Sequence, residues 1–263
     1  MSELSPRELE FLHQSNAIEG IENIDYRDAS RDSGHLAAFL DVQQRAGRHL
    51  PLAVGDLCRW QKWVTEEQVA FGHALPAGGA GVLRSPSYPH EVRVGGYIAP
   101  SYREVLGLID ELVDDVNAKL AAVGMFANDV KVAETLGEMV QRFEAICPFV
   151  DGNGRTGRLL LTYLALRCHQ PIVVIRAAER PVYDAAHRSK AAMRVFMADK
   201  MREAIDWPGR GVLERTAVRQ GADVYDGLII ERHALLAKRE EWAQPELSGE
   251  RGASTSSRVR ASS

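Results

Sequence analysis

The sequence predicts a mainly α-helical fold with one small β-hairpin. Through most of the chain, apolar residues recur three or four positions apart, the spacing of helices that bury one face. One segment rich in Gly, Pro and Ser, residues 78–100, interrupts this pattern. The 263 residues, 45% of them hydrophobic, are sufficient for a real core. The predicted fold class is therefore α, and the hairpin is its exception.

The first helix has a recognisable start and stop. Ser5 followed by Pro6 is typical of an N-cap and a first helical position, and Gly20 is a typical end signal. Periodic apolar stretches predict further helices over residues 35–45, 52–71, 102–122, 127–146, 159–167, 182–199 and 212–238. We expect the helix at 159–167 to be buried and to end before Pro171.

The interrupting segment predicts a β-hairpin with a long tip. Val82-Leu83-Arg84 and Val92-Arg93-Val94 are short strand-like runs, and a turn-rich Ser-Pro-Ser-Tyr-Pro-His stretch lies between them. We expect these two runs to pair. At the other end of the chain, residues 245–263 lack apolar anchors and are expected to be disordered.

Composition excludes several classes of protein. A formal net charge of -4 provides no overall basic field, so nucleic acid is not an expected partner. No apolar run is as long as a membrane span and the N-terminus has no signal-peptide pattern, so we expect a cytoplasmic protein without a membrane partner. The scattered cysteines Cys58, Cys147 and Cys168 argue against a disulfide framework and against a zinc site.

A glycine-rich run between two helical stretches carries the chemistry. It reads Cys-Pro-Phe-Val-Asp-Gly-Asn-Gly-Arg-Thr-Gly-Arg from Cys147 to Arg158. A helix beginning near Gly154 offers free N–H groups, glycines allow a phosphate to approach, and two arginines supply fixed charge. Asp151 adds an oxygen ligand suited to magnesium shared with phosphates. A calcium loop would need a later glutamate, which is absent. The run favours a polyphosphate site.

This run resembles the signature of the Fic family, His-Pro-Phe-x-(Asp/Glu)-Gly-Asn-Gly-Arg-x-x-Arg. It matches every specified position except the first, where Cys147 replaces histidine. The resemblance implies a Fic fold and a nucleotidyl transferase, a protein adenylyltransferase that moves AMP from ATP, with Mg²⁺, to a Ser, Thr or Tyr hydroxyl of a target protein. Pyrophosphate is released, and the reaction is called AMPylation.

The resemblance also implies a role for each residue of the run. Asp151 would hold magnesium, Gly152, Asn153 and Gly154 would form an anion hole, Asn153 and Arg155 would orient the phosphates, and Arg158 would bind the terminal phosphate. Cys147 would take the position of the catalytic base. Further along, Tyr183 lies where family members often place an adenine-pocket tyrosine, although an aromatic residue on such a helix is more often part of the core.

The segment Ser15-Asn16-Ala17-Ile18-Glu19-Gly20 resembles the family's inhibitory motif, (Ser/Thr)-x-x-x-Glu-(Gly/Asn). The resemblance implies a salt bridge from Glu19 to Arg158, which would occupy the arginine that binds the γ-phosphate, while Ser15 holds the helix in place. In some family members the same glutamate positions water for removal of AMP. A deAMPylase that uses Glu19 is therefore an alternative.

The hairpin resembles the family's flap, which pairs with an extended target segment by adding a strand at about residues 82–94. Arg84 and Gly95-Gly96 fit the flap pattern, although a plain surface hairpin is the alternative. The resulting division is an inhibitory helix at 1–22, a Fic core at 23–200, C-terminal helices at 201–244 and a tail at 245–263. Target identity, nucleotide preference and homo-oligomerisation stay open.

Cys147 stands where the family's histidine deprotonates the incoming hydroxyl. Two arginines and a helix N-terminus favour the thiolate, so we expect a lowered thiol pKa, although sulfur reaches less far than an imidazole nitrogen. Three hypotheses follow: a slow or retuned transferase, a thiol nucleophile that takes up a nucleotidyl group, and a catalytically silent nucleotide-binding regulator. An engineered substitution and a DNA-binding or toxin–antitoxin scaffold are further alternatives.

Overall fold

The computed structural model describes residues 3–206, apart from 23, 28, 30, 31, 33, 95, 96 and 124–128. The predicted helix at 212–238 and the predicted tail at 245–263 lie outside the described residues, as does most of the segment 201–244. Among the described helices, none is long and apolar enough to cross a membrane.

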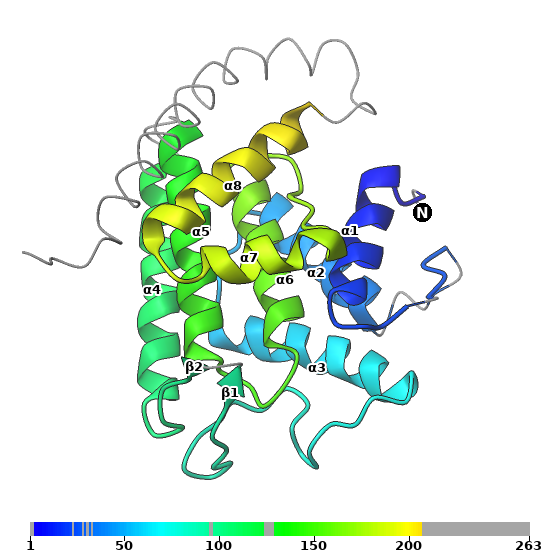
Figure 1. Ribbon diagram of the computed structural model, residues 1–263, viewed down its shortest axis with the longest axis vertical. Helices are drawn as coiled ribbons and strands as arrows, with labels where there is room; N and C mark the ends of the chain where they lie inside the picture. The colour runs from blue at the N-terminus through cyan, green and yellow to red at the C-terminus, as the bar shows by residue number, and fades with distance from the viewer. Residues whose placement is uncertain are drawn as a thin grey trace, which may run out of the picture.

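The described part of the chain is mainly α-helical, as predicted (Figure 1). Its elements are α1 (Pro6–Ala17), α2 (Gly34–Gly47), α3 (Val54–Ala70), β1 (Arg93–Val94), β2 (Tyr97–Ile98), α4 (Val105–Val123), α5 (Asp129–Ile146), α6 (Asn153–Arg167), the 3-10 turn η1 (Ala177–Glu179), α7 (Arg180–Ala186) and α8 (Lys190–Ile205).

Helix α6 lies at the centre of the core. It packs against α1, α2, α3 and α5, and α5 in turn packs against α4 and α8. In Figure 1, α4 and α5 run side by side and α8 crosses the upper half of α5. The side chains of Leu159, Leu160, Leu161 and Leu164 are completely buried. Because each buried leucine contributes about 1.5–3 kcal/mol, this run fixes α6, and with it the loop that precedes α6.

The N-terminal helix begins and ends as predicted. The Ser5 hydroxyl accepts a hydrogen bond from the Glu8 amide at 3.4 Å, and the Glu8 carboxylate accepts one from the Ser5 amide at 2.6 Å. Pro6 occupies the first helical position. Beyond the last turn Gly20 adopts φ +74°, a left-handed conformation that favours glycine.

The predicted pairing of the hairpin strands is wrong. β1 pairs antiparallel with β2, with Arg93 opposite Ile98 and Val94 opposite Tyr97. Residues 82–84 form no strand with them, because Arg84 is fully buried and binds elsewhere. Its backbone amide donates to the Pro148 carbonyl at 2.9 Å. A buried guanidinium must find acceptors for its donors, and the nearest carbonyls lie in the loop after α5 rather than in a sheet.

The single helix predicted over 182–199 is also wrong. The chain forms α7 and then starts again as α8 at Lys190, because the Ser189 hydroxyl caps the second helix by accepting from the Ala192 amide at 3.1 Å. The residue-200 boundary proposed above falls within α8. The other described helices lie within a few residues of their predicted ranges.

Candidate active site

The loop between α5 and α6 is shaped by one glycine. Gly152 is the N-cap of α6 with φ +76°, and a Cβ at this position would lie 2.9 Å from Thr65 Cγ2 on α3. Any other residue would therefore be both strained and crowded. The first amides of α6 have no acceptor within the helix, so its N-terminus is a positive end facing the loop.

Asn153 closes this loop on itself. Its Oδ1 accepts from the Phe149 amide at 3.0 Å, and its Nδ2 donates to the Phe149 carbonyl at 2.8 Å. The Phe149 ring is completely buried and anchors the same turn. In this structure the Asn153 side chain therefore shapes the backbone that would contact phosphates.

Arg155 connects the loop to α3. It is 1% exposed, and its guanidinium donates to the Val64 carbonyl at 2.7 Å and to the Gln68 side-chain oxygen. The amide of Gln68 donates in turn to Asp151 Oδ2 at 2.7 Å. The family resemblance implies phosphate contact for Arg155, but the hydrogen bonds of this guanidinium face α3.

Asp151 is suited to a magnesium ion shared with phosphates. Its carboxylate is half-buried, with Oδ1 accepting from the Gly152 amide at 2.6 Å and Oδ2 from Gln68. Within the part of the chain that the structure describes, no three His, Cys, Asp or Glu side chains gather into a metal cage. One carboxylate beside a phosphate loop is a donor set that magnesium accepts, because this ion takes its remaining ligands from phosphates and water.

Arg158 is held by the end of α1. Its Nη2 lies 2.8 Å from Glu19 Oε1 and donates to the Ser15 carbonyl at 2.8 Å, while its Nε donates to the Ser15 hydroxyl at 3.0 Å. The salt bridge implied by the resemblance is formed in this structure. A Cβ added at Gly154 would lie 2.6 Å from Glu19 Oε1, so the carboxylate rests against the first turn of α6.

The charge on Glu19 is secured by its neighbours. Burial alone would raise the pKa of this carboxyl, but Arg158, and more weakly Arg155 and Arg180, outweigh burial and hold the pKa below its ordinary value. Glu19 is therefore an anion at neutral pH. It lies at the positive end of a helix, the position that favours an anionic ligand.

The end of α1 is tied to the segment beyond α6 as well. Arg180 Nη1 donates to the Ile18 carbonyl at 2.5 Å, and the Gln14 side chain accepts from the Ala177 amide at 2.9 Å. Asn16 donates to Tyr26 at 2.5 Å and to Glu67 at 2.8 Å. Residues on both sides of Glu19 thus fix its position.

Cys147 differs from expectation in the charge state of its thiol. It is 4% exposed with φ +45°, and its Sγ donates to the Glu144 carbonyl at 2.9 Å. Burial and then the Glu144 carboxylate raise the pKa of this thiol to about 11, which Arg84 only partly offsets. The expectation of a lowered thiol pKa is therefore wrong, because the arginines of the loop bind elsewhere and burial dominates.

Tyr183 is a core residue in this structure. It is 2% exposed, and its hydroxyl donates to Glu144 Oε1 at 2.6 Å. The other carboxylate oxygen of Glu144 lies 2.9 Å from His187 Nε2. Sequence reasoning missed both Glu144 and His187, since the two are far apart in the chain and no motif contains them.

The β-hairpin is anchored beside the start of the loop. Arg84 donates to the carbonyls of Cys147 at 2.8 Å and Ile146 at 2.9 Å, and also to those of His90 and Pro100, both at 3.0 Å. The hairpin itself presents apolar side chains to solvent. Val94 is 59% and Ile98 58% exposed.

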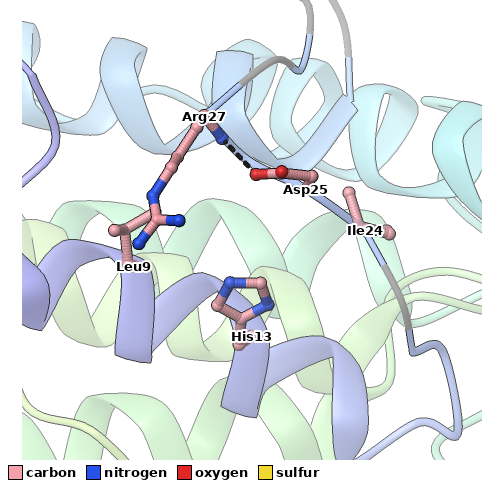
Figure 2. A pocket seen from close by; sticks show the side chains of 5 residues that line it. All are labelled: Leu9, His13, Ile24, Asp25 and Arg27. Atoms are coloured by element: carbon pink, nitrogen blue, oxygen red, sulfur yellow. Dashed lines mark hydrogen bonds between the residues drawn. The ribbon is translucent and has the colours of Figure 1, made fainter.

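A pocket of about 400 Å³ lies on the other side of α1 and contains no loop residue. Figure 2 shows its lining, which consists of Leu9, His13, Ile24, Asp25 and Arg27, with the Arg27 amide donating to the Asp25 carboxylate at 3.0 Å. His13 and Ser15 are two residues apart on α1, so they project from nearly opposite faces. The pocket is therefore separate from the loop.

Comparison with known proteins gives a consistent result. The profile of the Fic/DOC family matches residues 3–165. The protein adenylyltransferase Fic of Drosophila willistoni is 30% identical and that of Aedes aegypti 33% identical, each over 113 residues, which make up 43% of this chain and 20% of the relative. The chain thus matches about one fifth of the length of these curated relatives.

Solved structures resemble the fold. A Fic domain containing signaling protein from Bacteroides thetaiotaomicron superimposes with a TM-score of 0.54 at 18% identity, over 84% of each chain. Fic-1 (residues 134–508) from C. elegans gives a TM-score of 0.54 at 17% identity, over 88% of this chain and 66% of that one. At these identities the likeness concerns the fold alone.

Proposed function

The chain belongs to the Fic/DOC family, and we propose that it is a protein adenylyltransferase that transfers AMP from Mg-ATP to a hydroxyl of a protein target and is inhibited by Glu19. The curated relatives named above support transfer of this kind at the level of the family. One observation carries the proposal: the Glu19 carboxylate lies against the first turn of α6 and pairs with Arg158 at 2.8 Å.

A carboxylate in this position is an internal substitute for a phosphate. Helix N-termini and arginines bind both kinds of anion, and here both features are already engaged by one side chain of the same protein. A nucleotide whose terminal phosphate pairs with Arg158 must therefore displace Glu19. Inhibition follows because the two anions compete for one guanidinium.

The remaining loop residues divide the work of binding. Asp151 would hold magnesium, which neutralises phosphate charge when bound, and the amides of Gly152, Asn153 and Gly154 would contact the phosphates. Asn153 and Arg155 would act by keeping the loop in shape, as their hydrogen bonds to Phe149 and to α3 indicate. Transfer of a phosphoryl-type group depends mainly on such positioning and neutralisation.

The target would be a protein segment that extends along the hairpin. Among the described residues β1 and β2 form a two-stranded sheet, and its edges can accept a further strand. The exposed side chains of Val94 and Ile98 would contact such a segment.

A silent nucleotide-binding regulator is the second candidate, and one observation favours it. The buried Cys147 thiol, with its pKa near 11, is protonated at neutral pH and accepts no proton from an incoming hydroxyl. In that case the loop binds nucleotide and transfers nothing.

The direct test uses ATP labelled in the α-phosphate, magnesium and cell lysate. We expect Glu19→Gly to label protein about 10- to 100-fold faster than the native chain, because a hydrogen bond to a charged group contributes about 1.5–3 kcal/mol. Glu22→Gly is the matched control, since Glu22 is exposed and outside the Arg158 contact. It should label like the native chain.

The outcomes separate the two candidates. Labelling that rises only in Glu19→Gly supports the inhibited transferase. Nucleotide binding that tightens in Glu19→Gly without labelled protein, in the presence of lysate, supports the regulator. If neither chain labels protein or binds nucleotide, both candidates are wrong.

A further inference from the structure

A second group of ionisable side chains, Glu144, Tyr183 and His187, lies next to the loop, and the proposed function assigns it no role. Glu144, near the end of α5, contacts Tyr183 of α7 at 2.6 Å and His187 just after α7 at 2.9 Å. The hydrogen bond of Tyr183 thus joins α7 to the end of α5.

This group lies beside the first residue of the loop and beside α6. The Cys147 thiol is bound to the carbonyl of Glu144 at 2.9 Å. The carboxylate of the same residue lies against α6, because a Cβ at Gly157 would be 2.8 Å from Glu144 Oε1. Gly157 follows Gly154 by three residues, so Glu19 and Glu144 rest on α6 about one turn apart.

His187 is held in the manner of a catalytic histidine. Its Nε2 faces Glu144, and its side chain is 20% exposed. The contact between Nε2 and Glu144 Oε2 is 2.9 Å long but lacks hydrogen-bond geometry, so it is an ion pair, and no hydrogen bond of Nδ1 is found among the residues that the structure describes. An imidazole paired with a carboxylate at one nitrogen, with the other nitrogen available, is suited to accepting a proton from a substrate.

We propose that His187, oriented by Glu144, is the general base of the transfer reaction and supplies the function that the family signature places at position 147. This inference rests on the proposed adenylyltransferase function. Nδ1 of His187 takes the proton of the target hydroxyl while the hydroxyl oxygen bonds to the α-phosphorus. The bond from the α-phosphorus to the bridging oxygen breaks, and pyrophosphate leaves with that electron pair.

The charges around His187 determine when it can act. Burial lowers its pKa, whereas Glu144 on α5 and Asp184 on α7 raise it, and Arg158 on α6 lowers it slightly; Tyr183 also packs against the ring. The net pKa lies above the ordinary value of 6.5. His187 is therefore unprotonated, and able to act as a base, only above its raised pKa. Labelling should rise with pH through that pKa.

The decisive experiment compares His187→Gln in two backgrounds, Glu19→Gly and Glu19→Gly with Cys147→His, using autolabelling with labelled ATP. In the cysteine background His187→Gln should lower labelling at least about 100-fold, the effect typical of losing a general base. In the histidine background its effect should be less than about 3-fold, since a base is then present at position 147. His169→Asn is the control, because His169 is exposed and its φ of +58° suits asparagine.

Each outcome decides the question. Equal losses in both backgrounds would mean that His187 is only structural, and the inference would be overturned. The same holds if the cysteine background labels nothing while the histidine background labels well, although the adenylyltransferase function would then stand. If no variant labels, the function itself fails, and with it the inference. A pH profile that rises above pH 6.5 in the cysteine background and loses this rise in His187→Gln would support it.

Discussion

The two arginines of the loop signature, Arg155 and Arg158, are three residues apart on one helix and both are buried. Their hydrogen bonds nevertheless go to different elements. Arg155 is 1% and Arg158 2% exposed. Arg155 donates to Val64 and Gln68 of α3, which belongs to the packed core. Arg158 donates to Ser15 and Glu19 at the end of α1, whose carboxylate a nucleotide could replace.

In the proposed function, one motif thus combines a fixed part and an exchangeable part. The partners of Arg155 are neutral groups of α3, and one of them, the Gln68 side chain, also donates to Asp151. The principal partner of Arg158 is an anion 31% exposed to solvent. Competition by another anion is therefore easy at Arg158 and difficult at Arg155.

Replacement of Arg158 should produce the largest change. In the Glu19→Gly background, Arg158→Ala should lower labelling about 10²- to 10³-fold, the loss typical of removing one donor to a transition-state oxygen. Arg167→Ala, on the same helix but bound to Leu50 and Tyr163, is the control. Labelling within 3-fold of the Glu19→Gly chain would contradict the exchangeable role of Arg158.

Replacement of Arg155 should instead reduce stability. Arg155→Ala leaves the Val64 carbonyl and the Gln68 side chain without their buried partner, so the free energy of unfolding should fall by about 2–3 kcal/mol. Urea denaturation of Arg155→Ala, with Arg158→Ala alongside, measures this change in the free energy of unfolding. An Arg155→Ala chain with native stability and no nucleotide binding would mean that Arg155 acts on phosphates directly.

Removal of the Ser15 hydroxyl should weaken inhibition without abolishing it. Ser15→Ala loses the hydrogen bond from Arg158 Nε but keeps the one to the Ser15 carbonyl, so labelling should rise about 2- to 10-fold. This increase should be smaller than that of Glu19→Gly in a parallel labelling assay. A larger increase would show that Ser15, and not Glu19, provides most of the inhibition.

The ion pair of Glu19 with Arg158 and that of His187 with Glu144 should show opposite and small pH effects on stability. The pKa of Glu19 is lowered, so its pairing stabilises the fold above pH 4.5 and this contribution is lost as pH falls through the lowered pKa. The pKa of His187 is raised, so its pairing with Glu144 stabilises below pH 6.5 and is lost as pH rises through the raised pKa. Each contribution should be below about 1 kcal/mol.

Urea denaturation between pH 4 and pH 9 measures both limbs of this profile. Glu19→Gln should flatten only the acid limb and His187→Gln only the alkaline limb. Loss of both limbs in either variant would show that the two pairs are not independent.

Local signals in the sequence were enough for much of the fold. The Ser5-Pro6 start of α1 and the Gly20 stop after it depend on neighbouring residues, and both predictions match the structure. The pairing of the hairpin was predicted wrongly, because a buried Arg84 satisfied its donors in a loop more than 60 residues away. No local pattern contains that contact.

For the site as well, features carried by sequence motifs were predictable, and features that depend on packing were not. The contact between Glu19 and Arg158 follows from two motifs, and it is present. The charge state of Cys147 was not predictable, since burial and Glu144 decide it and both depend on packing. The approach of His187 to Glu144 joins two helical segments that share no motif, so only the three-dimensional structure reveals it.

Arg84 gives the hairpin a further property. One guanidinium binds carbonyls before β1, after β2 and at the end of α5, and the Tyr97 hydroxyl adds a bond to the Ala145 carbonyl at 2.7 Å. The described residues of the hairpin are therefore joined to the start of the loop by several hydrogen bonds. If a target pairs with this hairpin, the distance from the added strand to the loop is set by these hydrogen bonds. The register of the added strand then determines which hydroxyl of the target reaches the nucleotide.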